Sequence, residues 1–468
     1  MTENVKNAVV IVVDALRTDR VGVYSGGSLT PNIDSLAQDG EVFERCYSCI
    51  NATDPSVTTI LTGQYPIRHG ILNHGGEITE VEQNRVSGTT PFTGLLTDTH
   101  QSIGIDTLER WHKRGFNQYH NPRFNERNAV LNRLDSDGKI SSIANKVIGV
   151  LGFANSNRPV RSEAITDLAT DFIRRSKQPF FLFTHYWESH VPYIPMAELP
   201  DWIRDRNYDD DEIPLEEAFQ AIKGSPWKKR LDTRLTGGAD TIADMKHKYD
   251  AGIWKVDKAV GEMIAVLKDQ NLFEETAIIV TADHGESLTE HGIYFDHHGL
   301  YDPSVHVPLI INAPGFDGRE TQFVQHFDLA PTILDLVDVD YSGQIFDGNS
   351  LVHTGSRSLN REAVYIEESH TNRRRAIRTE THKYIKKLDD RELCRYCEIK
   401  HGSDEELYNL NTDPDETRNI IDKHPEVAQE LERKLDSWIR NLPDPMKKKE
   451  SFEPSDEVKD HLEEMGYI

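Results

Sequence analysis

Apolar runs of strand length alternate along the chain with segments of helical periodicity. The apolar runs, which are typical of strands buried in a parallel sheet, lie at Val9–Val13, Phe43–Cys49, Phe180–Thr184, Thr276–Thr281 and Val307–Ile311. The helical segments, two of them opened by a proline after a capping residue, lie at Thr30–Asp39, Asp54–Leu61, Ser162–Ser176 and Lys246–Asp269. This alternation predicts an α/β fold built on a doubly wound, mostly parallel sheet.

The pattern changes after about residue 350, where the segments become shorter. Short strand candidates precede a helical segment at Pro425–Leu442, and they lie at Ala363–Glu367, Lys383–Lys387 and Leu407–Leu410. We therefore expect a main α/β domain over residues 1–350, a small C-terminal α+β subdomain over 351–446, and a charged tail over 447–468. A chain of 468 residues is long enough for both cores.

Acidic residues outnumber basic ones by 78 to 53, which gives a net charge of −25. Such a surface repels nucleic acid and anionic membranes, so we expect no nucleic-acid partner and interpret the charge as an aid to solubility. No window approaches the roughly 18 apolar residues of a membrane span. The first residues are polar, unlike a signal peptide. We therefore expect no membrane span and a cytoplasmic location.

Polar residues follow two of the predicted strands at the point where each strand ends. Asp14 follows the first strand, and Asp283 and His284 follow Thr276–Thr281. The carboxyl ends of parallel strands meet at one edge of a sheet. Carboxylate oxygens and imidazoles suit Mg²⁺, Mn²⁺, Ca²⁺ or Zn²⁺. A single aspartate after a strand is often only a cap, but three such residues favour a site for one divalent metal ion.

Thr53 lies just before the helix that Asp54-Pro55 begins. The N–H groups and dipole of a helix N-terminus attract an anion. A threonine hydroxyl is a poor nucleophile, but a metal ion bound to its oxygen lowers the pKa of the hydroxyl. The alternative is that Thr53 only donates and accepts local hydrogen bonds.

Histidines gather near the predicted strand ends and loops, at His69, His185, His190, His284, His291, His297 and His298. A lone histidine is more often structural. A dense group beside strand ends more often supplies metal ligands, or an acid that protonates a leaving group.

The cysteines form two CxxC pairs, Cys46 with Cys49 and Cys394 with Cys397. Two such pairs make a tetrahedral zinc site if the fold brings them together. The alternative is that Cys46 is a buried thiol on a strand and that the other cysteines have no shared role.

Several segments, in order along nearly the whole chain, resemble the motifs of the sulfatase family in the alkaline phosphatase superfamily. These segments are Val13–Arg17, Thr53–Pro66, His190–Tyr193, Thr281–Ser287, His297–Ile310 and Glu406–Thr417. The resemblance implies an alkaline phosphatase-like α/β fold with a small C-terminal subdomain. It also implies metal-dependent hydrolysis of a small anionic substrate, a sulfate or phosphate ester.

The resemblance implies roles for individual residues. The metal ligands would be Asp14, Thr53, Asp283 and His284. The catalytic groups would be Thr53, His190 and His297, the last standing where the family usually has a lysine. We expect two further histidines of the cluster, His185 and His298, to bind the substrate.

Three departures from the family pattern bear on the chemistry. Thr53 stands where sulfatases carry a cysteine or serine that becomes formylglycine, Ala15 replaces the second aspartate of the first motif, and Val57 replaces an arginine. Threonine cannot become that aldehyde, so a hydrated aldehyde cannot expel sulfate here. Threonine is the nucleophile in phosphodiesterases and phosphotransferases of the superfamily, which favours phosphoester or phosphodiester chemistry. The alternative is a catalytically inactive, metal-binding protein that recognises an anionic ligand or a protein partner.

Overall fold

The computed structural model describes residues 5–122, 161–177, 179–208, 213–231, 236–352, 361–369, 373–394 and 398–442. Its centre is an eight-stranded sheet with the order β5-β4-β6-β1-β7-β8-β2-β9. In chain order these strands are β1 (Asn7–Val13), β2 (Glu41–Phe43), β4 (Gln101–Ile105), β5 (Gln118–His120), β6 (Phe180–Tyr186), β7 (Thr276–Ala282), β8 (Leu309–Asn312) and β9 (Gly318–Glu320). Neighbouring strands are parallel, except that β8 runs antiparallel to both β7 and β2.

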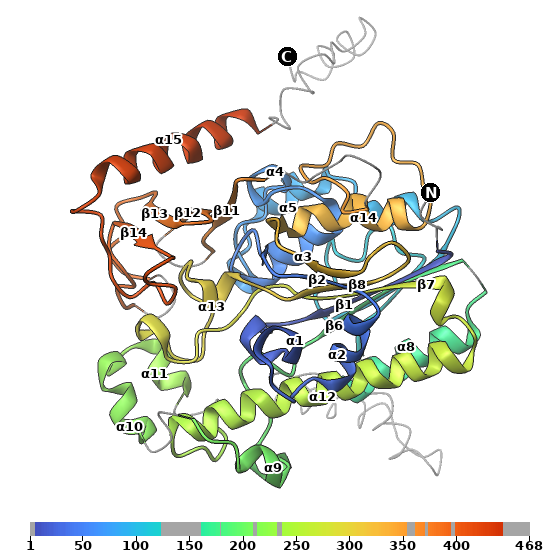
Figure 1. Cartoon of the computed structure of the whole chain (residues 1–468), viewed down its shortest axis with the longest axis horizontal. Coiled ribbons are helices and arrows are strands. Elements are labelled where there is room, and N and C mark those ends of the chain that lie inside the picture. The colour runs from blue at the N-terminus through green and yellow to red at the C-terminus, as the bar shows by residue number, and fades with distance from the viewer. Residues whose placement is uncertain are drawn as a thin grey trace, which may run out of the picture.

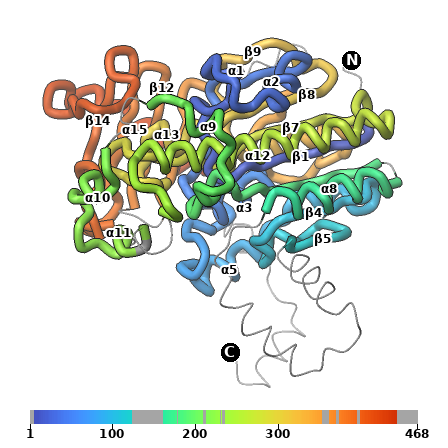
Figure 2. The backbone as a smooth tube through the Cα atoms, turned by 90° about the horizontal axis from the view of Figure 1, so that it is seen from below, coloured from blue at the N-terminus to red at the C-terminus, as the bar shows by residue number. Residues whose placement is uncertain are grey.

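Helices cover both faces of this sheet (Figure 1). One face carries α2 (Pro31–Gln38), α8 (Ser162–Arg175) and α12 (Ile242–Asp269), and the opposite face carries α3 (Thr53–Thr62) and α14 (Leu329–Leu336). The long helix α12 and helix α8 lie side by side (Figure 2). All residues of β1, β6 and β7 are buried, as strands between two helical layers must be. The predicted doubly wound α/β fold is confirmed.

Shorter elements connect these layers. They are α1 (Gly22–Ser25), α4 (Pro66–His69), α5 (Glu80–Ser87), α9 (Asp201–Arg204), α10 (Leu215–Ala218), α11 (Pro226–Arg230) and α13 (Asp302–Val305), with β3 (Cys46–Tyr47) paired to β10 (Val324–Gln325). The apolar pattern of Phe43–Cys49 predicts a single strand, and this prediction is wrong. Phe43 ends β2, and Cys46 begins β3, which pairs with a different partner. No helix in the described part of the chain is long and apolar enough to cross a membrane.

The C-terminal part forms a separate antiparallel sheet of four strands in the order β11-β12-β13-β14. These strands are β11 (Ala363–Glu367), β12 (Arg374–Thr379), β13 (His382–Lys387) and β14 (Glu405–Asn409), and helix α15 (Pro425–Asn441) packs on them (Figure 1). The predicted α+β subdomain is confirmed. The boundaries placed at residues 350 and 446 stay predictions, and the charged tail at 447–468 lies outside the described residues.

Candidate active site

Three neighbouring parallel strands bring the central site residues together. Asp14 follows β1, Asp283 follows β7, and His185 is the next-to-last residue of β6. The backbone N–H of Asp14 donates to the carbonyl of Tyr186 at 2.8 Å. The N–H of Ala15 donates to Oδ1 of Asp283 at 3.1 Å, which joins the ends of β1 and β7. The strand ends therefore meet at one edge of the sheet, as the sequence predicts.

The side chains of Asp14, His185 and Asp283 form a compact group of metal-ligand atoms. One ligand atom from each lies within 4.8 Å of the others, and all three side chains are fully buried. His284 completes the group, because its Nε2 atom lies 3.5 Å from Oδ1 of Asp14 and 3.4 Å from Oδ2 of Asp283. The structure thus gathers Asp14, Asp283 and His284 as expected, and it adds His185.

This group fits a divalent cation. Both carboxylate oxygens of Asp14, Oδ2 of Asp283 and Nε2 of His185 are buried and have no hydrogen-bond partner. Burying uncompensated carboxylates costs several kcal/mol. Burial and the nearby Asp283 carboxylate raise the pKa of Asp14 well above its usual range. A cation among these oxygen and nitrogen atoms would supply the missing charge and partners.

His185, which the sequence assigns to substrate binding, instead points its Nε2 atom at the two carboxylates. That atom lies 4.0 Å from Oδ2 of Asp14 and 3.8 Å from Oδ2 of Asp283. On the other side of the ring, Nδ1 lies 3.0 Å from Oδ1 of Asp106. Burial lowers the pKa of His185, but the carboxylates of Asp106 and Asp283 outweigh it and raise the pKa above its ordinary value. Its Nε2 atom therefore faces the same space as the carboxylates of Asp14 and Asp283.

Thr53 is the first residue of α3, and its side chain is buried beside this group. Its Oγ1 atom lies 3.3 Å from Nε2 of His284. The hydroxyl and the ligand group are therefore brought together from elements far apart in the sequence.

The two histidines expected to be catalytic lie next to His284. The ring centroids of His284 and His297 are 4.2 Å apart, and those of His190 and His297 are 5.5 Å apart. The Nδ1 atom of His190 lies 2.5 Å from the carbonyl oxygen of Val191. Because a carbonyl can only accept, Nδ1 carries the proton and Nε2 is left as the proton acceptor.

Burial and neighbouring imidazoles keep these histidines neutral. Burial and then His284 lower the pKa of His190 to about 4. Burial, His284 and His190 lower the pKa of His297 well below its usual range. Before substrate binds, both rings are therefore neutral at neutral pH and are not imidazolium acids.

His298, the other residue expected to bind substrate, faces away from this cluster. Its Nε2 atom lies 3.3 Å from Oδ2 of Asp296, and its Nδ1 atom lies 3.8 Å from Sγ of Cys394. Adjacent residues of an irregular segment point to different sides, so His297 belongs to the candidate active site and His298 to the boundary with the C-terminal subdomain.

Among the described residues, the cysteines do not come together as a four-cysteine zinc site requires. Cys46 is buried in the main core, and Cys49 packs with Tyr65 and Phe327. Within the described ranges, no group of potential ligands joins either thiol to Cys394. Cys397 lies outside the described residues. The first CxxC pair is therefore part of the apolar packing.

Sequence reasoning missed three polar residues around the site. Asp106 follows β4 as Asp14 follows β1, so the same strand-end argument could have identified it. His74 lies 2.7 Å from Oδ2 of Asp54, the residue after Thr53, through its Nδ1 atom. The side-chain amide of Asn51 donates to the carbonyl of His297 at 2.8 Å. No sequence signal distinguishes the last two from ordinary loop residues.

Comparisons with known proteins match this architecture. The family model described as Sulfatase matches residues 6–339, and the model described as N-sulphoglucosamine sulphohydrolase, C-terminal, matches residues 289–441. A protein named as an uncharacterised sulfatase, YidJ, from Escherichia coli is 25% identical over 463 residues, which cover 94% of this chain and 88% of that protein. Arylsulfatase K from Danio rerio is 25% identical, over 92% of this chain and 83% of that protein.

Solved structures show the same fold. A phosphonate monoester hydrolase from Silicibacter pomeroyi superposes with a TM-score of 0.68 at 22% identity, over 93% of this chain and 96% of that one. A protein solved with its substrate D-glucosamine-2-N,6-O-disulfate gives a TM-score of 0.67 at 21% identity, over 94% of this chain and 99% of that one. The Sulfatase model covers well over half of the sequence and includes every strand-end residue of the candidate active site. The chain belongs to the sulfatase family.

Proposed function

We propose that this chain hydrolyses a phosphate monoester or diester, with Thr53 as the nucleophile beside one divalent metal ion. Its family makes it a hydrolase of sulfuric or phosphoric esters. The choice of Thr53 as nucleophile rests on one observation. Its buried hydroxyl lies 3.3 Å from Nε2 of His284, at the edge of the ligand group that contains Asp14 and Asp283.

In the proposed ligand set, Asp14, Asp283, His284 and Thr53 would hold the metal, and Nε2 of His185, which faces both carboxylates, would add a nitrogen. A divalent cation held there would polarise the non-bridging oxygens of the ester and favour the alkoxide of the nucleophile. The buried carboxylate oxygens of Asp14 and Asp283 that have no hydrogen-bond partner support this assignment, because a cation would supply the partner that they lack.

The reaction then runs in two displacements. A bond forms between Oγ1 of Thr53 and phosphorus while the bond from phosphorus to the leaving oxygen breaks. The proton of the Thr53 hydroxyl passes to a neighbouring imidazole, and His190 or His297 returns one proton to the leaving oxygen. Water then attacks phosphorus and gives a proton to the neighbouring imidazole, while the bond from phosphorus to Oγ1 breaks and the imidazole returns that proton to Oγ1. The contact between Nδ1 of His190 and the carbonyl of Val191 leaves Nε2 without a proton, which supports His190 as the first acceptor.

The choice of phosphorus over sulfur follows from the side chain at position 53. A threonine ester has no hydroxyl on the carbon that bears the ester oxygen, so it cannot collapse to an aldehyde and release sulfate. Water must instead attack the central atom, which phosphoryl transfer allows at sites of this composition.

The part of the substrate that does not react would lie in a polar cavity of about 310 Å³ between α5 and the C-terminal sheet. Its lining includes Arg85, Arg373 and Arg375, and also Asn73, which precedes His74. The lining also contains Glu77, Glu82, Glu367 and Glu368, so its charge is mixed, and an anionic group of the substrate would pair with an arginine that no glutamate occupies. Arg373 is exposed, whereas Arg375 is paired with Glu367 at 2.5 Å.

The test is turnover of an aryl phosphate, a bis-aryl phosphate and an aryl sulfate by the Mn²⁺-loaded chain. The proposal predicts that a phosphate ester has the highest kcat/KM, that Thr53→Ala lowers kcat by at least about 10³-fold, and that Thr53→Ser retains turnover. Thr62→Ala, at the other end of α3, is the matched control. Preference for aryl sulfate would contradict the choice of phosphorus.

The inactive alternative rests on Ala15 and Val57, which replace two polar residues of the family pattern. It predicts tight metal binding with no turnover of any of the three ester classes. The same assay therefore separates the two functions.

A further inference from the structure

We propose that His298, Cys394 and His401 bind a zinc ion at a second site, separate from the catalytic metal. The site lies between the segment that carries His297 and the connection from β13 to β14. It does not depend on the reaction proposed above.

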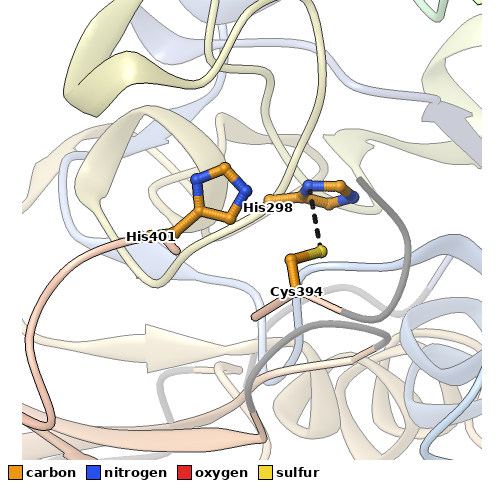
Figure 3. A group of neighbouring side chains, drawn as sticks. All are labelled: His298, Cys394 and His401. Atoms are coloured by element: carbon orange, nitrogen blue, oxygen red, sulfur yellow. Dashed lines mark hydrogen bonds between the residues drawn. The ribbon is translucent and has the colours of Figure 1, made fainter. Parts of the chain in front are cut away.

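The geometry of the three side chains carries the proposal. One ligand atom from each lies within 4.8 Å of the others, and the two rings and the sulfur surround one small space (Figure 3). The Sγ atom of Cys394 lies 3.8 Å from Nδ1 of His298. All three residues are buried, with exposed fractions of 1–4%. Cys394 and His401 belong to one connection, whereas His298 is 96 residues before Cys394, so local sequence does not account for its meeting with them.

The spacing matches zinc coordination. Zinc binds thiolate sulfur at about 2.3 Å and imidazole nitrogen at about 2.0–2.1 Å, so at a tetrahedral angle the two atoms lie about 3.6 Å apart. The observed 3.8 Å between sulfur and nitrogen is close to that value. The described residues supply three ligands, and a tetrahedral ion takes a fourth from elsewhere in the chain or from water.

The ligand types favour zinc over the cations that suit the catalytic site. Thiolate and imidazole select Zn²⁺ among common cellular divalent ions, whereas Mg²⁺ and Ca²⁺ prefer oxygen. The catalytic group of Asp14, Asp283, His185 and His284 contains no thiol. The two sites therefore differ in the metals they prefer.

Asp296 supplies the outer support that histidine ligands usually have. Its Oδ2 atom lies 3.3 Å from Nε2 of His298. A proton on Nε2, shared with this carboxylate, leaves the lone pair of Nδ1 facing Cys394. Oδ1 of Asp296 accepts from the backbone N–H of His297 at 2.8 Å. The same aspartate thus connects the proposed zinc ligand to the backbone of a catalytic histidine.

Zinc binding here would fasten the C-terminal subdomain to the active-site segment. The N–H of Cys394 donates to the carbonyl of Ile399 at 2.8 Å. His298 lies in the same segment as Gly299, whose N–H donates to Glu368 of the C-terminal subdomain at 3.0 Å. The zinc site would add a further connection across this boundary, next to His297.

Cobalt substitution tests the site directly. A Cys394 thiolate bound to Co²⁺ gives an intense charge-transfer band in the near ultraviolet, which a site of carboxylates and imidazoles cannot give. We expect this band in the cobalt-loaded wild-type chain, and about one equivalent of zinc that survives dialysis against a weak chelator. Cys394→Ser and His401→Ala should each remove the band and that zinc. Cys49→Ala, a buried thiol outside the cluster, should keep both.

Absence of the band from cobalt-loaded wild-type protein would overturn the proposal, and so would full zinc retention by both variants. Either result would mean that His298 and Cys394 contact each other without a metal ion. The wild-type spectrum needs no variant, so the test stands if a substitution prevents folding. Failure here is distinct from failure of the proposed hydrolase, because turnover is measured with Mn²⁺ on the phosphate and sulfate esters.

Discussion

Asp106 accepts from Nδ1 of His185 at 3.0 Å, and this contact determines which nitrogen of the imidazole faces the metal-ligand group. With the proton held on Nδ1, the lone pair of Nε2 points toward Asp14 and Asp283. Asp106 also accepts from the hydroxyl of Tyr119 at 3.0 Å through its other oxygen, which fixes the carboxylate. This carboxylate–imidazole arrangement is typical of histidines that bind metals.

Asp106→Asn should weaken Mn²⁺ binding by about 10–100-fold. An amide is neutral, so it holds the proton of His185 on Nδ1 less strongly than a carboxylate does. His185→Ala should weaken Mn²⁺ binding at least as much. Calorimetric titration of Mn²⁺ into the metal-free chain measures both effects. Asp98→Asn, an exposed residue nearby in the sequence, is the control. Unchanged affinity in both variants would return His185 to the role of a substrate contact.

Arg373→Ala should raise KM about tenfold with little change in kcat, because an arginine at the rim of the cavity would contact the substrate without touching the reacting group. Steady-state kinetics on an aryl phosphate with an additional carboxylate would measure this most clearly. Arg418→Ala, outside the cavity, should leave KM unchanged. A fall in kcat alone would mean that Arg373 does not bind the substrate as proposed.

Arg374→Met should lower the free energy of unfolding by about 3–5 kcal/mol, because it leaves two buried carboxylates without their cation. Arg374 is 1% exposed, and it contacts Glu368 and Glu406 at 3.0 Å each. Lys387→Met is the matched control, since Lys387 pairs opposite Arg374 in the sheet but contacts only the exposed Asp404, and it should cost less than about 1 kcal/mol. Urea denaturation of both variants measures the difference, and equal losses would contradict the account.

Relative to the wild type, the Glu188→Gln variant should be more stable at pH 8 than it is at pH 5. Burial raises the pKa of Glu188 from 4.5 to about 7, despite hydrogen bonds from Ser162. The folded state therefore holds the proton more tightly than the unfolded chain, so this stabilisation is complete below about pH 4.5 and is lost as the pH rises through about 7.

Replacement by Gln removes that dependence. As the pH rises from about 4.5 to about 7, the free energy of unfolding of the variant should increase relative to that of the wild type by on the order of 2–3 kcal/mol. Urea midpoints of both proteins at pH 5 and pH 8 give the comparison. A constant difference between the two proteins at both pH values would show that Glu188 does not titrate abnormally.

Helices and central strands could be predicted from the sequence where the spacing of apolar residues fitted only one type of secondary structure. Helix α8 was predicted to within one residue because its apolar positions recur at helical spacing, and β1 and β7 because both of their faces are apolar. Strand β12 could not be predicted, since Arg374 and its neighbours look exposed. The arginine is buried only because Glu368 and Glu406 reach it from other segments.

The core of the candidate site was predictable for a similar reason. Asp14 and Asp283 follow parallel strands, and adjacent strands end together. The separate directions of His297 and His298 were not predictable, because two neighbouring residues in a loop carry no periodicity. The meeting of His298 with Cys394 depends on how the C-terminal subdomain packs, which no local pattern records.

The central claim is that Asp14, His185, Asp283, His284 and Thr53 surround a single cation at the ends of β1, β6 and β7. Anomalous scattering from a crystal of the chain grown with Mn²⁺ tests it most directly. The account predicts one strong manganese peak within coordinating distance of Asp14, Asp283 and Nε2 of His185. A peak that lies elsewhere, or a well-ordered site with no manganese among these residues, would contradict it.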